Sequence, residues 1–483
     1  MTGTSARMAL LREQGLNAWS RVTPASALAV GLIALPCLFW ILASWPGNFT
    51  EDSLGTIMDI RQGRYADTVP VTYTLYAQVI TFGGRFIPGV MFVQCALVSV
   101  ALYVLGRSLG AKQRAAVVIV VVMMATPIGG LFACMAWKDV PFAALILIGL
   151  AVLLPIAGCL TRGRWIAGVS LLAVGSTMRH NGWPLLLALG IVTIAVVALP
   201  CLRKVGLVGF GLGSIAAAIL GVGLHAVTMV AVDATPSPAV YRDLPALGDL
   251  AYAATVYPND SPPGIVPFVD TFSTGESRVA AATCSSVNGL HLYSGFDKGV
   301  AGRNPSQTYR LLWELAKANP KLVVYLRLCR AAAFLPPPLS SGPSYIFWLT
   351  PGIVANDLGV DTQPAMPKLH AIARSWFDLW AKGAGFVAWA GLWGLLGTAA
   401  LVGLLAFRMI DTRRLIAYLG VVWLGLSTVA VWALGQDTRY AYIPLLVSQV
   451  ACVIALMALG RRLVEPRRRP ESQPQPEELA AGR

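Results

Sequence analysis

The sequence SALAVGLIALPCLFWILASWPGNFTEDS, residues 26–53, joins an uninterrupted apolar run to a polar segment that ends with two adjacent carboxylates and a serine. A run of about 20 apolar residues crosses the hydrocarbon core of a bilayer as a helix. No clear small-residue cleavage site follows it, so we expect the run to stay as an anchor. Glu51 and Asp52 are then predicted to lie where a helix has just left the membrane.

The rest of the chain extends this pattern. Of its 483 residues, 56% are hydrophobic and 12% are charged, which is far outside the range of soluble proteins. Apolar runs without strand-like alternation favour helices over a membrane barrel. We therefore predict an all-α polytopic membrane protein with about ten transmembrane helices and a large non-cytoplasmic loop domain. The predicted spans are residues 26–44, 86–106, 115–133, 140–158, 165–183, 184–201, 206–231, 385–407, 414–434 and 441–459.

The loops between these runs differ in charge. Alternate short loops are rich in basic residues, and such loops stay in the cytoplasm during insertion. They carry Arg107, Lys112, Arg114, Arg162, Arg164, Arg203, Lys204, Arg408, Arg413 and Arg414. This distribution predicts a multi-pass membrane protein with both termini in the cytoplasm. The net charge of +14 is scattered over loops and a basic tail, which predicts contact with membrane lipids and argues against nucleic acid.

The spans divide the chain into four predicted parts. They are an N-terminal transmembrane module (1–231), a large outer loop or cap (232–383), C-terminal transmembrane helices (384–460) and a disordered basic, Pro-rich cytoplasmic tail (461–483). In the first outer loop, residues 51–65 have helical spacing and are expected to lie on the bilayer surface. In the second, Asn319-Pro320 is predicted to cap a new helix after a helix over 306–318.

Cysteines and histidines give weaker signals. Cys284 and Cys329 share the large outer loop and could pair in an oxidising compartment, although Cys134 lies close enough to the outer face to be an alternative. His180, His225, His291 and His370 stand isolated from one another in the sequence, and no metal-ligand spacing occurs.

Ionisable residues gather at the non-cytoplasmic ends of the predicted spans. They belong to four short segments: Glu51-Asp52, Lys138-Asp139, Arg179-His180-Asn181 and Gln436-Asp437-Thr438-Arg439-Tyr440. Each segment alone has an ordinary explanation, such as a local ion pair, a snorkelling anchor or a helix-start preference. Charges at span ends are costly unless they pair or face a wet cavity, so their presence on one face predicts a shared polar chamber.

The stretches PGNFTEDS, AWKDVPF, STMRHNG and GQDTRYAYIP resemble those of the GT-C superfamily of lipid-dependent membrane glycosyltransferases. That superfamily includes protein O-mannosyltransferases and the aminoarabinose transferases of lipid A. The similarity in architecture covers most of the chain. One departure is Val69-Pro70, because many relatives have His-Pro after the first outer helix.

This resemblance implies a protein of the bacterial inner (cytoplasmic) membrane. It also implies a sugar donor on polyprenyl phosphate and an acceptor that is an envelope glycan, lipid or protein. The catalytic candidates are Asp52 as general base, Glu51 as its alternative, and Asp139 as an orienting residue. The leaving phosphate needs positive charge, for which the candidates are Arg179, Lys138 and Arg439. The substrate-binding candidates are His180, Asn181, Asp437 and Tyr440. The sequence requires no cofactor, although Asp139 is also a candidate ligand for a divalent cation.

Two other readings remain open. A transporter or flippase of lipid-linked saccharides would also need polar residues, but it predicts charges near the midplane and a repeat with broken helices. The centres of the predicted spans are nearly free of ionisable residues, His225 being one exception. An oligosaccharide polymerase or ligase would share the polar outer chamber, and it differs in using a diphosphate-linked oligosaccharide.

Overall fold

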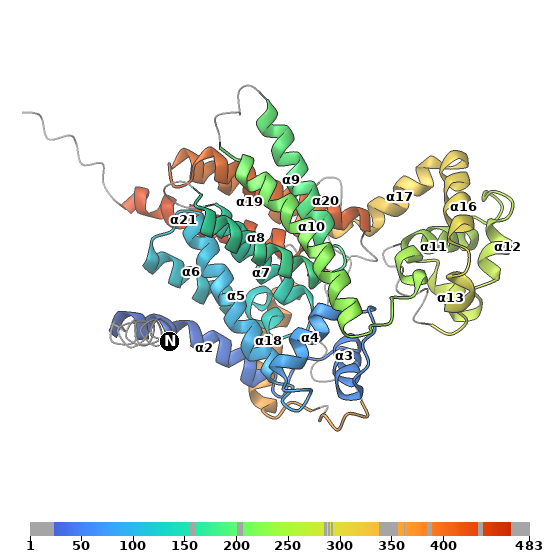
Figure 1. Ribbon diagram of the computed structural model, residues 1–483, viewed down its shortest axis with the longest axis horizontal. Coiled ribbons are helices and arrows are strands. Elements are labelled where there is room, and N and C mark those ends of the chain that lie inside the picture. The colour runs from blue at the N-terminus through green and yellow to red at the C-terminus, as the bar shows by residue number, and fades with distance from the viewer. Residues whose placement is uncertain are drawn as a thin grey trace, which may run out of the picture.

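The computed structural model describes residues 24–154, 160–199, 206–284, 287, 290, 293–337, 356–361, 363–383, 389–432 and 438–464 (Figure 1). Within these residues every regular element is a helix, and the only β-type pairings are three isolated bridges. The predicted all-helical class is therefore confirmed for the described part of the chain.

Most helices form one bundle. Its elements are α2 (Pro24–Ala43), α5 (Gly89–Ser108), α6 (Gln113–Ala125), η1 (Pro127–Leu131), α7 (Asp139–Leu153), α8 (Arg162–Thr177), α9 (Gly182–Ala198), α10 (Val208–Ala231), α19 (Ala390–Ala406), α20 (Thr412–Trp432) and α21 (Tyr442–Val464). Each predicted span overlaps at least one helix of this bundle within the described residues. By length and composition, α2, α5, α10, α20 and α21 could cross a membrane, whereas α6, α7, α9 and α19 are shorter apolar helices. The total of ten crossings stays a prediction.

Glycines let the bundle helices approach one another closely. An added Cβ on Gly190 of α9 would lie 2.8 Å from the carbonyl oxygen of Gly211 in α10. An added Cβ on Gly149 of α7 would lie 2.8 Å from the side chain of Leu172 in α8. Such small-residue contacts are how helices pack where no hydrophobic effect drives them together. They hold the ends of α7, α8, α9 and α10 in fixed relative positions.

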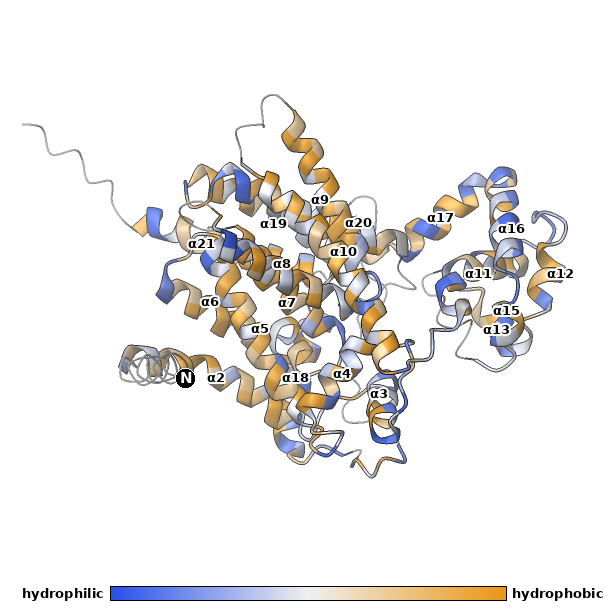
Figure 2. Ribbon diagram, in the orientation of Figure 1, coloured by the Kyte–Doolittle hydropathy of each residue, from blue (hydrophilic) through white to orange (hydrophobic). Residues whose placement is uncertain are grey.

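A second group of helices, which we call the helical cap (residues 239–334), stands beside the bundle and is more hydrophilic than it (Figure 2). It contains α11 (Ala239–Val256), α12 (Ile265–Asp270), α13 (Gly275–Ala280), α15 (Lys298–Ala301), α16 (Pro305–Ala318), α17 (Pro320–Arg330) and η3 (Ala332–Phe334). The cap has its own core, in which Leu250, Phe272 and Leu315 are almost fully buried. A separate core means that the cap is stabilised largely by its own packing.

Two predictions about the cap are confirmed. Asn319 caps α17, because its side chain accepts a hydrogen bond of 3.1 Å from the amide of Leu322, and Pro320 takes the first helical position. Cys284 and Cys329 form a disulfide, which ties α17 to the segment after α13. Cys134, the alternative partner, is instead buried with its sulfur 3.6 Å from that of Cys95.

Three further helices lie outside the cap and pack on the bundle or on one another. The helix predicted over 51–65 is α3 (Glu51–Gln62), which ends earlier because Gly63 takes a left-handed conformation with φ of 64°. Its apolar side packs with α4 (Val71–Ile80) in a small core that includes Ile57. The third, α18 (Pro367–Gly383), packs against α2, and its Trp376 indole donates to the carbonyl of Ala125 at 3.0 Å.

Candidate active site

The loop between α2 and α3 is attached by its backbone to the segment just before α7. Asn48 pairs with Met135 in a parallel bridge, and the amide of Ala136 donates to the carbonyl of Asn48 at 3.2 Å. The hydroxyl of Ser53 donates to the carbonyl of Ala136 at 2.8 Å. These contacts hold the first turn of α3, with its carboxylates, next to the start of α7. Two motifs that are far apart in the sequence therefore share one end of the bundle.

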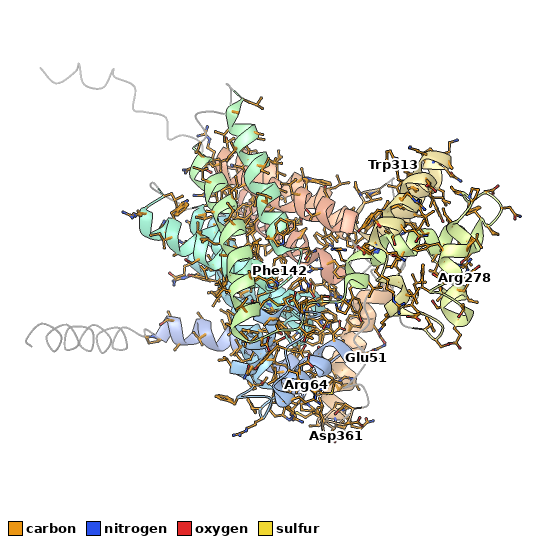
Figure 3. The ribbon with its side chains drawn as sticks, turned by 45° about the vertical axis from the view of Figure 1, so that its right-hand side comes forward. Glu51, Arg64, Phe142, Arg278, Trp313 and Asp361 are labelled. Carbon is orange, nitrogen blue, oxygen red and sulfur yellow. A yellow bond between two sulfur atoms is a disulfide. The ribbon has the colours of Figure 1, made fainter. Side chains whose placement is uncertain are left out.

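Asp139 and Arg179 form a buried ion pair at this end. Arg179 Nη1 lies 2.9 Å from Asp139 Oδ1, and the two residues are only 8% and 4% exposed. Asp139 begins α7, whereas Arg179 lies in the turn between α8 and α9. Because a buried charge without a partner is costly, each of these residues depends on the other for its place. The ring of Phe142, labelled in Figure 3, lies 5.8 Å from the guanidinium of Arg179.

Tyr440 brings a second arginine beside the first. Its ring centroid is 4.9 Å from the guanidinium carbon of Arg179 and 5.2 Å from that of Arg439. Arg439 also stacks over Trp137 at 5.2 Å. Aromatic faces attract cations and so partly offset the repulsion between two neighbouring guanidiniums. The η5 turn (Thr438–Ala441) thus carries a cation to the same place as the α8–α9 turn.

Asp52 lies at the edge of this cationic group. Its Oδ2 is 4.0 Å from Arg439 Nη1, and its side chain is 61% exposed. Glu51 is also exposed in the first turn of α3 (Figure 3). Neighbouring helix residues point about 100° apart, so the two carboxylates cannot face the arginines together. Between the two candidates for the base, Asp52 is the one that has the arginine contact.

Lys138 adds a third cation. Burial lowers the pKa of its ammonium group, the carboxylates of Asp139 and Asp52 act in the opposite direction, and Arg439 and Arg179 lower it further. The group of Lys138, Arg179 and Arg439 exceeds its two carboxylates by one positive charge. A net positive, partly desolvated cluster is suited to binding an anion.

The site also contains a residue that the sequence did not single out. Tyr73 of α4 is 3% exposed, and burial raises the pKa of its hydroxyl well above the ordinary value. The charges of Tyr76, Asp139 and Asp52 add to that rise. Tyr73 therefore stays protonated near both carboxylates. Nothing in the local sequence distinguishes it from an ordinary buried helix residue.

His180 contacts a carboxylate outside the cationic group, that of Asp67. Asp67 Oδ2 lies 3.2 Å from His180 Nε2 and 3.3 Å from His225 Nε2, so the expectation that these histidines are isolated from each other is wrong. Burial would raise the pKa of Asp67, but hydrogen bonds from His180 and His225, together with their charges, hold it below its ordinary range. Asp67 is fixed by its backbone, whose amide donates to the carbonyl of Thr235 at 2.9 Å. This Asp67 cluster was missed because its members share no sequence pattern.

The remaining candidates are placed less tightly. Asn181 precedes α9 as its N-cap residue, and no side-chain capping bond accompanies it. Asp437 lies outside the described residues. Among the residues that the structure describes, no group of three or more His, Cys, Asp or Glu side chains is arranged to hold a metal ion. The suggested role of Asp139 toward a divalent cation stays a prediction, and its observed partner is Arg179.

The structure therefore brings together Asp52, Lys138, Asp139, Arg179, Arg439 and Tyr440 from four separate parts of the chain. Their convergence was expected from the placement of charges at one set of helix ends. It describes a cationic cluster with an accessible carboxylate at its edge. Comparisons of the chain with protein-family models, with curated proteins and with solved structures found no match.

Proposed function

We propose that the cationic cluster is the active centre of a glycosyltransferase that moves a sugar from a polyprenyl-phosphate donor to an envelope glycan, lipid or protein. The observation that carries this proposal is the placement of Asp52 beside Arg439, at the edge of a cluster that also holds Lys138 and Arg179. A sugar phosphate needs both parts, namely cations for the phosphate and a base for the acceptor.

In the proposed reaction, the acceptor hydroxyl oxygen attacks the anomeric carbon of the sugar. The bond between that carbon and the phosphate oxygen breaks, and the phosphate leaves with the electron pair. Asp52 takes the proton of the acceptor hydroxyl. Because the side chain of Asp52 is 61% exposed, an acceptor can reach it without displacing a buried ion pair.

The arginines are proposed to bind the departing phosphate. Guanidinium groups stay charged and hold two phosphate oxygens at once, and in a poorly screened site they stabilise charge that develops in the transition state. Asp139 is then a positioning residue, since it contacts Arg179 at 2.9 Å. Lys138 contributes a further charge near both carboxylates.

The membrane arrangement belongs to the same proposal. Ten crossings with cytoplasmic termini would place the cluster and the helical cap on the non-cytoplasmic side, where an undecaprenyl-type donor and envelope acceptors meet. The helices that coincide with all ten predicted spans support this arrangement. Cysteine labelling from each side of sealed vesicles, at Glu51 and at Arg408, tests it directly.

Transfer by the purified protein tests the reaction. We expect Asp52→Asn to lower transfer from a polyprenyl-phosphate monosaccharide by at least about 100-fold, because base catalysis is worth that much. Binding of the donor should stay within about threefold of wild type. The matched control is Glu51→Gln, on the same helix turn, which should keep most of the activity.

The same assay separates the other functions. Full transfer by Asp52→Asn would remove this residue from the mechanism. Transfer only from a diphosphate-linked oligosaccharide would indicate a polymerase or ligase. Movement of an intact lipid-linked saccharide across vesicles, with no sugar released, would indicate a flippase.

A further inference from the structure

A cavity of about 490 Å³ lies where the helical cap meets the bundle. Its walls come from α11, α16 and α17 of the cap, from Leu335 after η3, and from Ala430 of α20. Ala430 lies near the C-terminal end of a helix that could cross a membrane. The cavity is therefore expected at the depth where hydrocarbon gives way to lipid headgroups.

The cavity has an apolar floor and a basic rim. Leu312, Leu328 and Leu335 provide aliphatic surface, and the side of Leu328 is exposed although it belongs to a folded helix. Arg242 and Arg327 line the same cavity and supply its positive charge. A ligand that fills it must combine an apolar chain with an anionic group.

Carboxylates beneath the rim hold both arginines in place. Arg242 Nε lies 3.0 Å from Asp243 Oδ1, and Arg327 Nη2 lies 2.5 Å from Asp249 Oδ2. The hydroxyl of Tyr309, which also lines the cavity, donates to Asp243 at 3.0 Å. A guanidinium carries five N–H donors, which is more than these contacts use. The arginines are thus oriented and can still donate to a ligand.

The charge balance favours an anion. Asp243 and Asp249 are fully buried and face three arginines, Arg242, Arg327 and Arg330, which leaves one positive charge in excess. Burial lowers the pKa of Arg327, with the neighbouring Tyr309 acting in the opposite direction. A bound anion would offset that desolvation.

We propose that this cavity binds a membrane lipid through its phosphate headgroup, with Arg242 and Arg327 on the phosphate and the acyl chain along Leu312 and Leu328. Lipid would then fasten the cap to the outer end of α20. The proposal uses residues apart from the cationic cluster and does not depend on the proposed sugar transfer.

Native mass spectrometry of the detergent-purified full chain tests this binding with four probes. Phosphatidylglycerol and phosphatidic acid should form adducts. Diacylglycerol, which lacks the phosphate, and glycerol phosphate, which lacks the chains, should each bind at least about tenfold more weakly. Equal binding of diacylglycerol would show that the rim plays no part. Equal binding of glycerol phosphate would show a free-phosphate site, and the lipid proposal would be wrong.

Variants on exposed positions locate the site. Arg242→Gln should weaken phosphatidylglycerol binding about tenfold, in line with the loss of charge-assisted hydrogen bonds. Leu328→Glu should weaken it at least as much, because it puts a like charge beside the phosphate. Arg310→Gln is the matched control, since Arg310 is similarly exposed on α16 (67% against 65% for Arg242) and does not line the cavity. Unchanged binding in both cavity variants would overturn the proposal.

Discussion

The cationic cluster and the helical cap both bury aspartate–arginine pairs, but the two pairs are built differently. In the cap, Asp249 contacts Arg327 and Arg330 and is fully buried, and Arg330 also donates to the carbonyl of Pro245. At the cluster, Asp139 holds Arg179, and that arginine also faces the ring of Tyr440 beside a further cation.

The difference separates two uses of the same interaction. The cap pair joins α11 to α17, because one buried carboxylate of α11 contacts two guanidiniums of α17. The pair at the cluster positions a guanidinium within a larger group of charges that includes the accessible Asp52. Loss of the cap pair should therefore mainly lower the free energy of unfolding. Loss of the cluster pair should mainly lower kcat/KM for the proposed sugar transfer.

The largest effect is expected in the cap. Asp249→Ala leaves the buried Arg330 and the partly exposed Arg327 without their carboxylate and should lower the free energy of unfolding by about 3–5 kcal/mol. Thermal unfolding followed by the reactivity of Cys37, a buried cysteine of the bundle, and by protease cleavage of the cap would measure it. A cap as resistant to protease as that of the wild type would contradict a structural role for the pair.

The next effect concerns Arg179. Arg179→Ala should lower kcat/KM for sugar transfer about 10²–10³-fold, equivalent to about 2.7–4 kcal/mol, because one transition-state contact is lost. The double variant Asp139→Ala with Arg179→Ala removes both charges. It should be more stable than Arg179→Ala alone, whereas its kcat/KM for sugar transfer should stay low. If the double variant also recovered activity, the pair would be structural, like that of the cap.

A smaller effect is expected at the Asp67 cluster. Asp67→Asn should destabilise the protein at neutral pH by about 1.5–3 kcal/mol through the loss of hydrogen bonds to a charged group. Because the pKa of Asp67 is lowered in the folded state, its contribution is present above the unfolded value of about 3.8 and is lost as the pH falls below it. Melting temperatures of both proteins should therefore converge over the range below about pH 3.8. A gap that stays constant over this range would contradict the assignment.

The smallest effect is expected at Tyr440. Tyr440→Leu removes the ring that lies between the two guanidiniums and should cost about 0.5–2 kcal/mol of transition-state stabilisation, or roughly 2- to 30-fold in kcat/KM. Tyr440→Phe keeps the ring and should stay close to wild type. If Phe were as impaired as Leu, the hydroxyl rather than the ring would be the important group.

The sequence predicted the cluster better than it predicted its surroundings. Charges are so costly at the ends of apolar helices that their positions alone indicated a common chamber, and Lys138, Asp139, Arg179 and Arg439 do meet. The Asp67 cluster could not be predicted in this way. It depends on a backbone bridge between Ala66 and Thr235, and such bridges leave no periodic signal in the sequence.

Geometry separates residues that the sequence could not tell apart. The orientation of the first turn of α3 brings Asp52 to Arg439, and residue type alone could not distinguish it from Glu51. The pairing of Cys284 with Cys329 likewise follows from the packing of α17 in the cap, which places the two Cα atoms 6.0 Å apart. Boundaries were less predictable, as the early end of α3 at Gly63 shows.

The bridge between Asn48 and Met135 has a consequence for the time at which the cluster can assemble during synthesis. Asp52 reaches its place only after the segment that precedes α7 has been made, and it meets Arg439 only once the turn before α21 follows. A growing chain therefore carries the separate charges without the assembled cluster. Synthesis itself delays the encounter of carboxylate and guanidinium until nearly all of the described helices have been made.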